Sequence, residues 1–78
     1  MKRIVIQVSE DTASSLRALA VRCTDEHRRK EGLTSHGALT LSKVLAMLAE
    51  DAAMVISRPG SWEGSNMAQV FQSHGYEV

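Results

Sequence analysis

The amino-acid sequence predicts a mainly α-helical chain with one N-terminal β-strand. Three observations predict this class: apolar and polar residues alternate over residues 2–8, apolar residues recur every three or four positions in two later stretches, and no second alternating run follows. A chain of 78 residues is one small domain, and a domain of this size buries only about 60% of its unfolded surface. The chain has one cysteine, so no disulfide can form within it, and it has no zinc-binding pattern. We expect no metal or cofactor that would add stability. We therefore expect a homodimer.

The alternating segment at residues 2–8 is the predicted strand. Its side chains would lie on opposite faces, with Ile4, Ile6 and Val8 on one and Arg3, Val5 and Gln7 on the other. A single strand cannot satisfy its own backbone N–H and C=O groups, and no second strand is available in the chain. We expect the same segment of a second copy to pair with it antiparallel across a two-fold axis. A two-stranded ribbon has the right width for the major groove of DNA.

A first helix is predicted from Glu10 to about Lys30. Ser9 is a favourable N-cap, and the acidic pair Glu10 and Asp11 suits the positive end of a helix. Gly32 is a natural stop. One apolar stripe runs along the helix, formed by Ala13, Leu16, Ala20, Cys23 and His27.

A second helix follows, and two residues compete to begin it. Either Ser35 or Thr40 could be its N-cap. The sequence Arg58-Pro59-Gly60 ends it. Its apolar stripe consists of Leu41, Val44, Leu45, Leu48, Ala52 and Val55.

The last part of the chain, residues 57–78, differs in composition from residues 1–56, which we predict to be the DNA-binding and dimerisation domain. The tail contains all three aromatic residues, Trp62, Phe71 and Tyr76. A short helix over Asn66–Ser73, capped by Ser65, could form there. The aromatic side chains could cover the dimer, dock a partner protein or join neighbouring dimers, because aromatic residues are enriched at interfaces of every kind.

Charge and residue pattern exclude several classes of protein. Nine basic residues balance nine acidic ones, but Lys2 and Arg3 precede the first acid, Glu10. No secretory signal or transmembrane run is present, which indicates a cytoplasmic protein. Nothing arranges an acid, a base and a pocket, so we do not expect an enzyme. Cys23 and His27 lie one helical turn apart, but two ligands do not make a metal site.

The order of strand, helix and helix resembles the ribbon-helix-helix family of DNA-binding proteins. The resemblance is carried by Lys2–Glu10, the first helical stripe and Thr40–Leu45, and it covers residues 2 to about 56. It implies an intertwined homodimer whose paired strands enter the major groove. The dimer core implied by this resemblance consists of Ile4, Ile6, Val8, Leu16, Leu45 and Leu48.

The same resemblance assigns DNA contacts to individual residues. Arg3, Val5 and Gln7 become the residues that touch base edges. Arginine can bind guanine and glutamine can bind adenine with two hydrogen bonds each, whereas Val5 departs from the usual polar choice and could only touch a thymine methyl group. The predicted phosphate contacts are Lys2 and the start of the second helix, namely Thr40, Leu41, Ser42 and Lys43.

These observations predict a sequence-specific DNA-binding regulator of transcription, a repressor that binds double-stranded DNA as a homodimer or as a higher assembly of dimers. Two alternatives stay open. One is an antitoxin-type interaction module that binds a partner protein through residues 57–78. The other is an accessory DNA-binding protein of a plasmid relaxosome or partition system.

Overall fold

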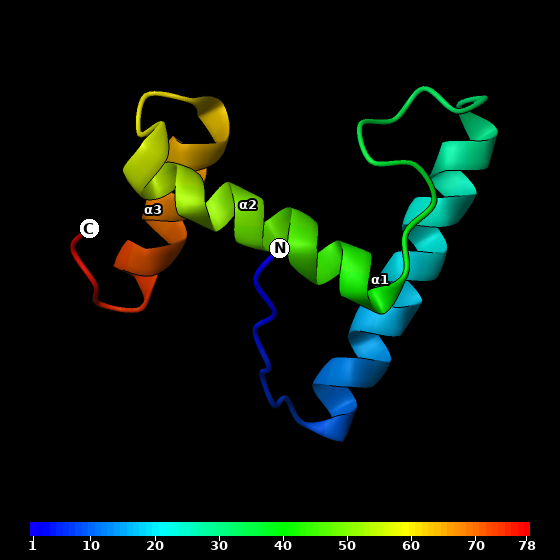
Figure 1. Ribbon diagram of the computed structural model, residues 1–78, viewed down its shortest axis with the longest axis horizontal. Helices are drawn as coiled ribbons and strands as arrows, with labels where there is room; N and C mark the ends of the chain where they lie inside the picture. The colour runs from blue at the N-terminus through cyan, green and yellow to red at the C-terminus, as the bar shows by residue number, and fades with distance from the viewer. The chain divides into compact units, whose positions relative to one another are not determined.

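The computed structural model describes all 78 residues and contains three α-helices and no β-strand (Figure 1). The helices are α1 (Glu10–Arg29), α2 (Leu41–Ser57) and α3 (Trp62–Ser73). The chain divides into two compact units, residues 1–44 and residues 45–78, with the boundary inside α2. We call them the N-terminal unit and the C-terminal unit.

The predicted N-terminal strand is wrong, and with it the predicted ribbon-helix-helix architecture. Residues 1–9 form no regular secondary structure, and we call them the N-terminal arm. No backbone N–H or C=O group of residues 1–8 has a hydrogen-bond partner. The physical reason is that alternation decides which side chains share a face, whereas a strand exists only where a neighbouring strand supplies hydrogen bonds. No other segment of the chain supplies them.

Helix α1 confirms the predicted first helix. The backbone N–H of Thr12 donates to Oγ of Ser9 at 3.1 Å, so Ser9 is the N-cap. At the other end, Glu31 N–H donates to the carbonyl of Arg28 at 3.0 Å and Gly32 N–H donates to that of His27 at 2.9 Å. This pair of bonds is a Schellman motif, which requires a left-handed residue directly after the C-cap, here Lys30. Glu31 occupies that position with φ of 54°, and the predicted stop, Gly32, comes next with φ of 84°.

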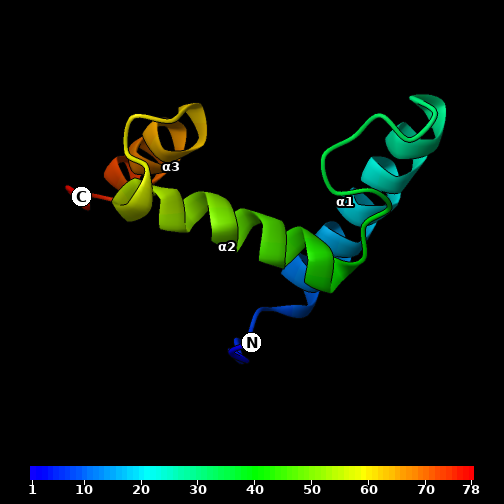
Figure 2. The same ribbon diagram turned by 45° about the horizontal axis from the view of Figure 1, so that its top comes forward.

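Helix α2 begins after Thr40, the second of the two predicted starts. The N–H of Lys43 donates to Oγ1 of Thr40 at 3.2 Å. The preceding connection folds back beside α1 (Figure 2), where Thr24 fixes its end. Oγ1 of Thr24 donates to the carbonyl of Leu39 at 3.1 Å and accepts from its N–H at 2.9 Å. Helix α2 ends at Ser57, two residues before Pro59, as predicted.

Helix α3 begins four residues before the predicted start at Asn66, and Ser61 caps it instead of Ser65. Oγ of Ser61 accepts from the N–H of Gly64 at 3.0 Å and donates to the carbonyl of Arg58 at 2.7 Å. Gly64 is buried. A Cβ atom there would lie 2.5 Å from the Arg58 carbonyl oxygen and 2.7 Å from that of Met54. The glycine that weakens the helical pattern in the sequence is therefore the residue that lets α3 approach the end of α2.

The apolar core of the single chain is small. Its only buried apolar side chains are Ala20, 5% exposed, and Val44, 1% exposed, both in the N-terminal unit. The predicted stripe of α1 is confirmed, because the other four of its members are half-buried. Along α2 the predicted stripe is also buried or half-buried, except for Leu48, which is exposed.

Candidate functional site

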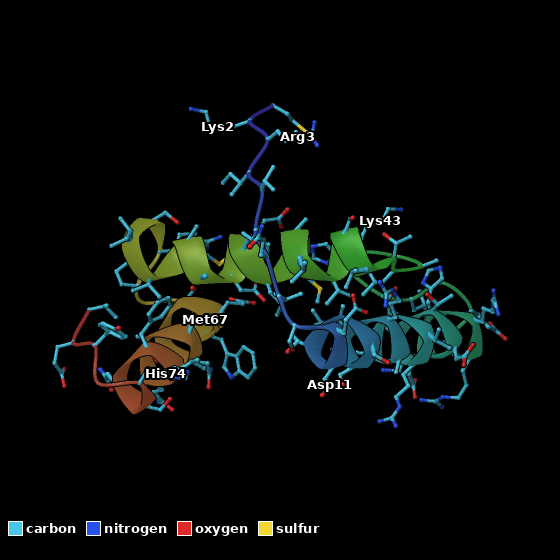
Figure 3. All side chains as sticks on the ribbon, turned by 90° about the horizontal axis from the view of Figure 1, so that it is seen from below. Lys2, Arg3, Asp11, Lys43, Met67 and His74 are labelled. Carbon is cyan, nitrogen blue, oxygen red and sulfur yellow. The ribbon has the colours of Figure 1, made fainter.

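The N-terminal arm carries the most accessible predicted functional residues. Every residue from 1 to 9 is exposed. Lys2 and Arg3 lie at the far end of the arm, well away from Asp11 in the first turn of α1 (Figure 3). Neither of them forms an ion pair, since the ion pairs of the chain lie within α1. Two cationic side chains are thus available to an anionic partner.

The predicted base-contacting residues, Arg3, Val5 and Gln7, all lie on this arm and are exposed. The apolar residues of the other predicted face are exposed too, from 79% at Ile4 to 47% at Val8. Burial therefore does not separate the two predicted faces. The arm combines two features that DNA and protein partners use, positive charge at its start and apolar side chains along its length.

The predicted phosphate-contacting residues at the start of α2 lie beside a shallow groove of about 320 Å³ in the N-terminal unit. Thr40 and Leu41 line this groove, whereas Ser42 and Lys43 are exposed. The α1 side of the groove includes Arg17 and Arg28, which are not among the predicted DNA contacts, and also Asp25, which forms an ion pair with Arg28. The helical spacing of the two arginines is a signal that could have indicated them, because positions 17, 21, 24 and 28 share one face of a helix.

The basic run at the end of α1 is partly neutralised by its own helix. The guanidinium of Arg29 donates to Oε2 of Glu26 at 2.7 Å, and Arg28 lies 3.7 Å from a carboxylate oxygen of Asp25. The hydrogen bond from Arg29, together with its charge, lowers the pKa of Glu26. The same bond raises the pKa of Arg29. These two arginines are thus less available to an external anion than Lys2 and Arg3.

Charge is divided unequally between the two units. The N-terminal unit holds eight of the nine basic residues and five of the nine acidic ones, a net charge of +3. The C-terminal unit holds one basic and four acidic residues, a net charge of −3. The neutral total therefore conceals a basic unit and an acidic unit, and the basic unit is the one that carries the arm.

The three aromatic residues of the C-terminal unit are all exposed, but they do not form one patch. Trp62 is 76% exposed and Tyr76 is 64% exposed. Trp62 and Phe71 are nine positions apart, which places them on opposite sides of α3. Beyond the helix, Tyr76 is held by a second Schellman motif, in which its N–H donates to the carbonyl of Phe71 at 3.0 Å. The left-handed residue of this motif is Gly75, with φ of 91°.

Cys23 and His27 belong to the packing of α1 and its following loop. Nδ1 of His27 lies 2.6 Å from Oγ1 of Thr34, within hydrogen-bond distance. Cys23 is a half-buried free thiol. No group of three or more His, Cys, Asp or Glu side chains is placed to hold a metal ion.

The residues predicted to form a dimer core are largely accessible in the single chain. Ile4, Ile6, Val8 and Leu48 are exposed, and Leu16 and Leu45 are half-buried. Their burial by a second copy stays a prediction.

No family model matches the chain, and no curated protein or solved structure matches it. None of the three helices is long and apolar enough to cross a membrane.

Proposed function

We propose that this protein is a cytoplasmic DNA-binding regulator, a repressor that contacts duplex DNA through its N-terminal unit. The observation that carries the proposal is the exposed N-terminal arm, on which Lys2 and Arg3 have no acidic partner. Arginine is the side chain best suited to guanine edges and to the negative potential of a narrow minor groove. A basic N-terminal arm can enter a DNA groove without belonging to a sheet. The net charge of +3 on the same unit favours approach to DNA.

We further propose that the regulator acts as a homodimer. Only two apolar side chains are buried within one copy, while both longer helices expose large apolar residues. A second copy would remove part of that surface from water, which is the main favourable term in association. Two copies would also present two arms to a repeated DNA site.

The experiment is selection of bound sequences from random duplex DNA, followed by anisotropy titrations with the enriched duplex. Arg3→Ala is expected to weaken binding to that duplex about 10- to 100-fold, the discrimination expected of one good arginine–base contact. Arg22→Ala is the matched control, because Arg22 is an exposed arginine of the same unit that lies outside both the arm and the groove. No enriched sequence, or equal losses for the two variants, would refute the proposal.

The predicted phosphate contact at the start of α2 is tested by the salt dependence of the same titrations. The logarithm of the binding constant should fall by about 0.9 per neutralised phosphate for each tenfold rise in salt. Lys43→Ala should reduce the steepness of this slope by about one such contact without changing the selected sequence. An unchanged slope would show that Lys43 does not contact a DNA phosphate.

A second candidate function is an antitoxin-type interaction module that uses the C-terminal unit. The exposure of all three aromatic side chains on the acidic unit favours it. Aromatic side chains are frequent anchors at protein interfaces. If a second polypeptide copurifies with the chain and protects residues 57–78 from proteolysis, and Trp62→Ala abolishes that protection, the second function is supported. Unchanged protection in the Trp62→Ala complex would contradict it.

A further inference from the structure

We propose that the N-terminal arm of one copy docks on an exposed ridge of α3 in a second copy, so that two copies exchange arms reciprocally. The α3 ridge consists of Trp62 and Val70, and Tyr76 and Glu77 follow beyond the C-terminal end of α3. Docking of this kind joins the basic unit of each copy to the acidic unit of the other. It requires no DNA and goes beyond the proposed DNA contact.

Both surfaces are apolar and uncovered. On the arm, Ile4, Val5, Ile6 and Val8 are exposed, and none of the backbone groups that carry them has a partner. On the ridge, Trp62 and Val70 are exposed, and Tyr76 is exposed beyond the end of α3. An exposed apolar segment that has no partner gains free energy when it is buried against a matching apolar surface.

The two surfaces match in length. Trp62, Asn66 and Val70 follow one another at four-residue spacing, so they lie along one side of α3. At 1.5 Å per residue, Trp62 and Val70 are about 12 Å apart along the helix axis. In an extended arm, Ile4 and Val8 are about 13 Å apart at 3.3 Å per residue. An extended arm can therefore place Ile4 near one end of the α3 ridge and Val8 near the other.

Charge sets the direction of the docked arm. Lys2 and Arg3 are the only charged residues before Glu10, and both are positive. Glu77 lies just past the C-terminal end of α3, where the aligned peptide dipoles of a helix add a partial negative charge. The start of the arm should therefore lie near Tyr76 and Glu77, and Val8 near Trp62. Glu63 lies at the opposite end, beside Trp62, where the arm carries no cation.

Docking would also regulate DNA binding. A docked arm holds Arg3 against the second copy, so the same side chain is not free to contact a base. This competition rests on the proposed function, whereas the docking itself does not. The experiment is therefore carried out without DNA, and a failure of DNA binding alone leaves its result unaffected.

The test is zero-length carbodiimide crosslinking of the full chain in an equal mixture of ¹⁴N- and ¹⁵N-labelled protein. Isotope-mixed crosslinks between Lys2 and Glu77, read by mass spectrometry, are expected. Crosslinks that are never isotope-mixed, or mixed crosslinks that join Lys2 only to Glu10 or Asp11 near the other arm, would overturn the proposal.

Sedimentation equilibrium of charge-reversed variants gives the second readout. Glu77→Lys is expected to weaken self-association about tenfold, whereas Glu63→Lys, the control at the other end of α3, is not expected to weaken it, because the acidic residues Glu10 and Asp11 follow the part of the arm that lies there. Mixing Glu77→Lys with Arg3→Glu should raise association above that of either variant alone. In the mixed pair, the unchanged arm of the first variant meets the unchanged Glu77 of the second. Equal losses for the two glutamate variants, with helicity by circular dichroism unchanged, would refute the proposed direction and with it the docking.

Discussion

The two units of this small protein hold a helix terminus in place by opposite means. In the N-terminal unit a side chain bridges the gap, because Oγ1 of Thr24 bonds both backbone groups of Leu39 across 15 positions. In the C-terminal unit the absence of a side chain closes the gap, because Gly64 allows the backbone of α3 to approach the carbonyls of Met54 and Arg58. The first device needs a particular hydroxyl, whereas the second needs empty space. The comparison predicts different sensitivities to mutation.

The units also differ in what they expose. The N-terminal unit is basic and ends in an arm without secondary structure, and the C-terminal unit is acidic and holds every aromatic residue of the chain. A protein with separate basic and acidic units can bind an anionic polymer with one of them and a protein with the other. The net charge of zero for the whole chain does not reveal this division into a basic and an acidic unit.

The largest expected effect on stability is at Gly64. Gly64→Ala places a methyl group 2.5 Å from a backbone oxygen, so the end of α2 and the start of α3 must move apart. Forcing extra volume into a tight contact costs about 1–3 kcal/mol, which exceeds the gain of about 1 kcal/mol from the better helix propensity of alanine. We expect the free energy of unfolding to fall, as measured by urea denaturation monitored by far-ultraviolet circular dichroism.

Gly60→Ala is the control for that prediction. A Cβ atom at Gly60 meets nothing within 4 Å, and its φ is not in the left-handed region. This variant should be neutral or slightly more stable than the parent, because alanine restricts the unfolded chain. Equal destabilisation by both substitutions would show that close backbone approach does not hold the C-terminal unit together.

A smaller effect is expected at Thr24. Thr24→Val keeps the shape of the side chain but removes both hydrogen bonds to Leu39, in a half-buried position. The expected loss is about 1–2 kcal/mol, since one donor and one acceptor of the backbone lose their partner. Thr34→Val, at an exposed threonine next to His27, should cost less. A larger loss for Thr34→Val would mean that the loop, and not its end, is what stabilises the N-terminal unit.

Helix positions could be predicted from the sequence where a local signal was decisive. Ser9, Thr40 and Pro59 mark helix ends through their own backbone chemistry, and the apolar stripe of α1 follows from helical periodicity. The start of α3 could not be predicted in the same way. Ser61 is a cap of the same kind, but Gly64 opposes helix formation locally and points to a later start, and its close approach to residues 54 and 58 across a turn is not visible in the local sequence.

The strand was predicted wrongly because pairing is not a local property. Residues 2–8 alternate as a strand would, but a single chain gives them no neighbour. The candidate site likewise has one feature that follows from local sequence and one that does not. Exposure of Lys2 and Arg3 follows from their place before the first helix, whereas the position of Arg17 and Arg28 beside Leu41 depends on how the loop folds back along α1.

The smallest expected effect is a gain in stability at Glu31, and it tests how tightly the N-terminal unit fixes the end of α1. A left-handed conformation crowds the Cβ atom of any residue but glycine, and Glu31 adopts one with φ of 54°. Glu31→Gly should raise the free energy of unfolding by about 0.5–1 kcal/mol, because relief of this crowding exceeds the entropic cost of glycine. Lys30→Gly, one residue earlier at φ of −91°, has no crowding to relieve and should lower the free energy of unfolding. If both glycine variants lose stability in urea denaturation, crowding at Glu31 is not what limits the stability of this helix end.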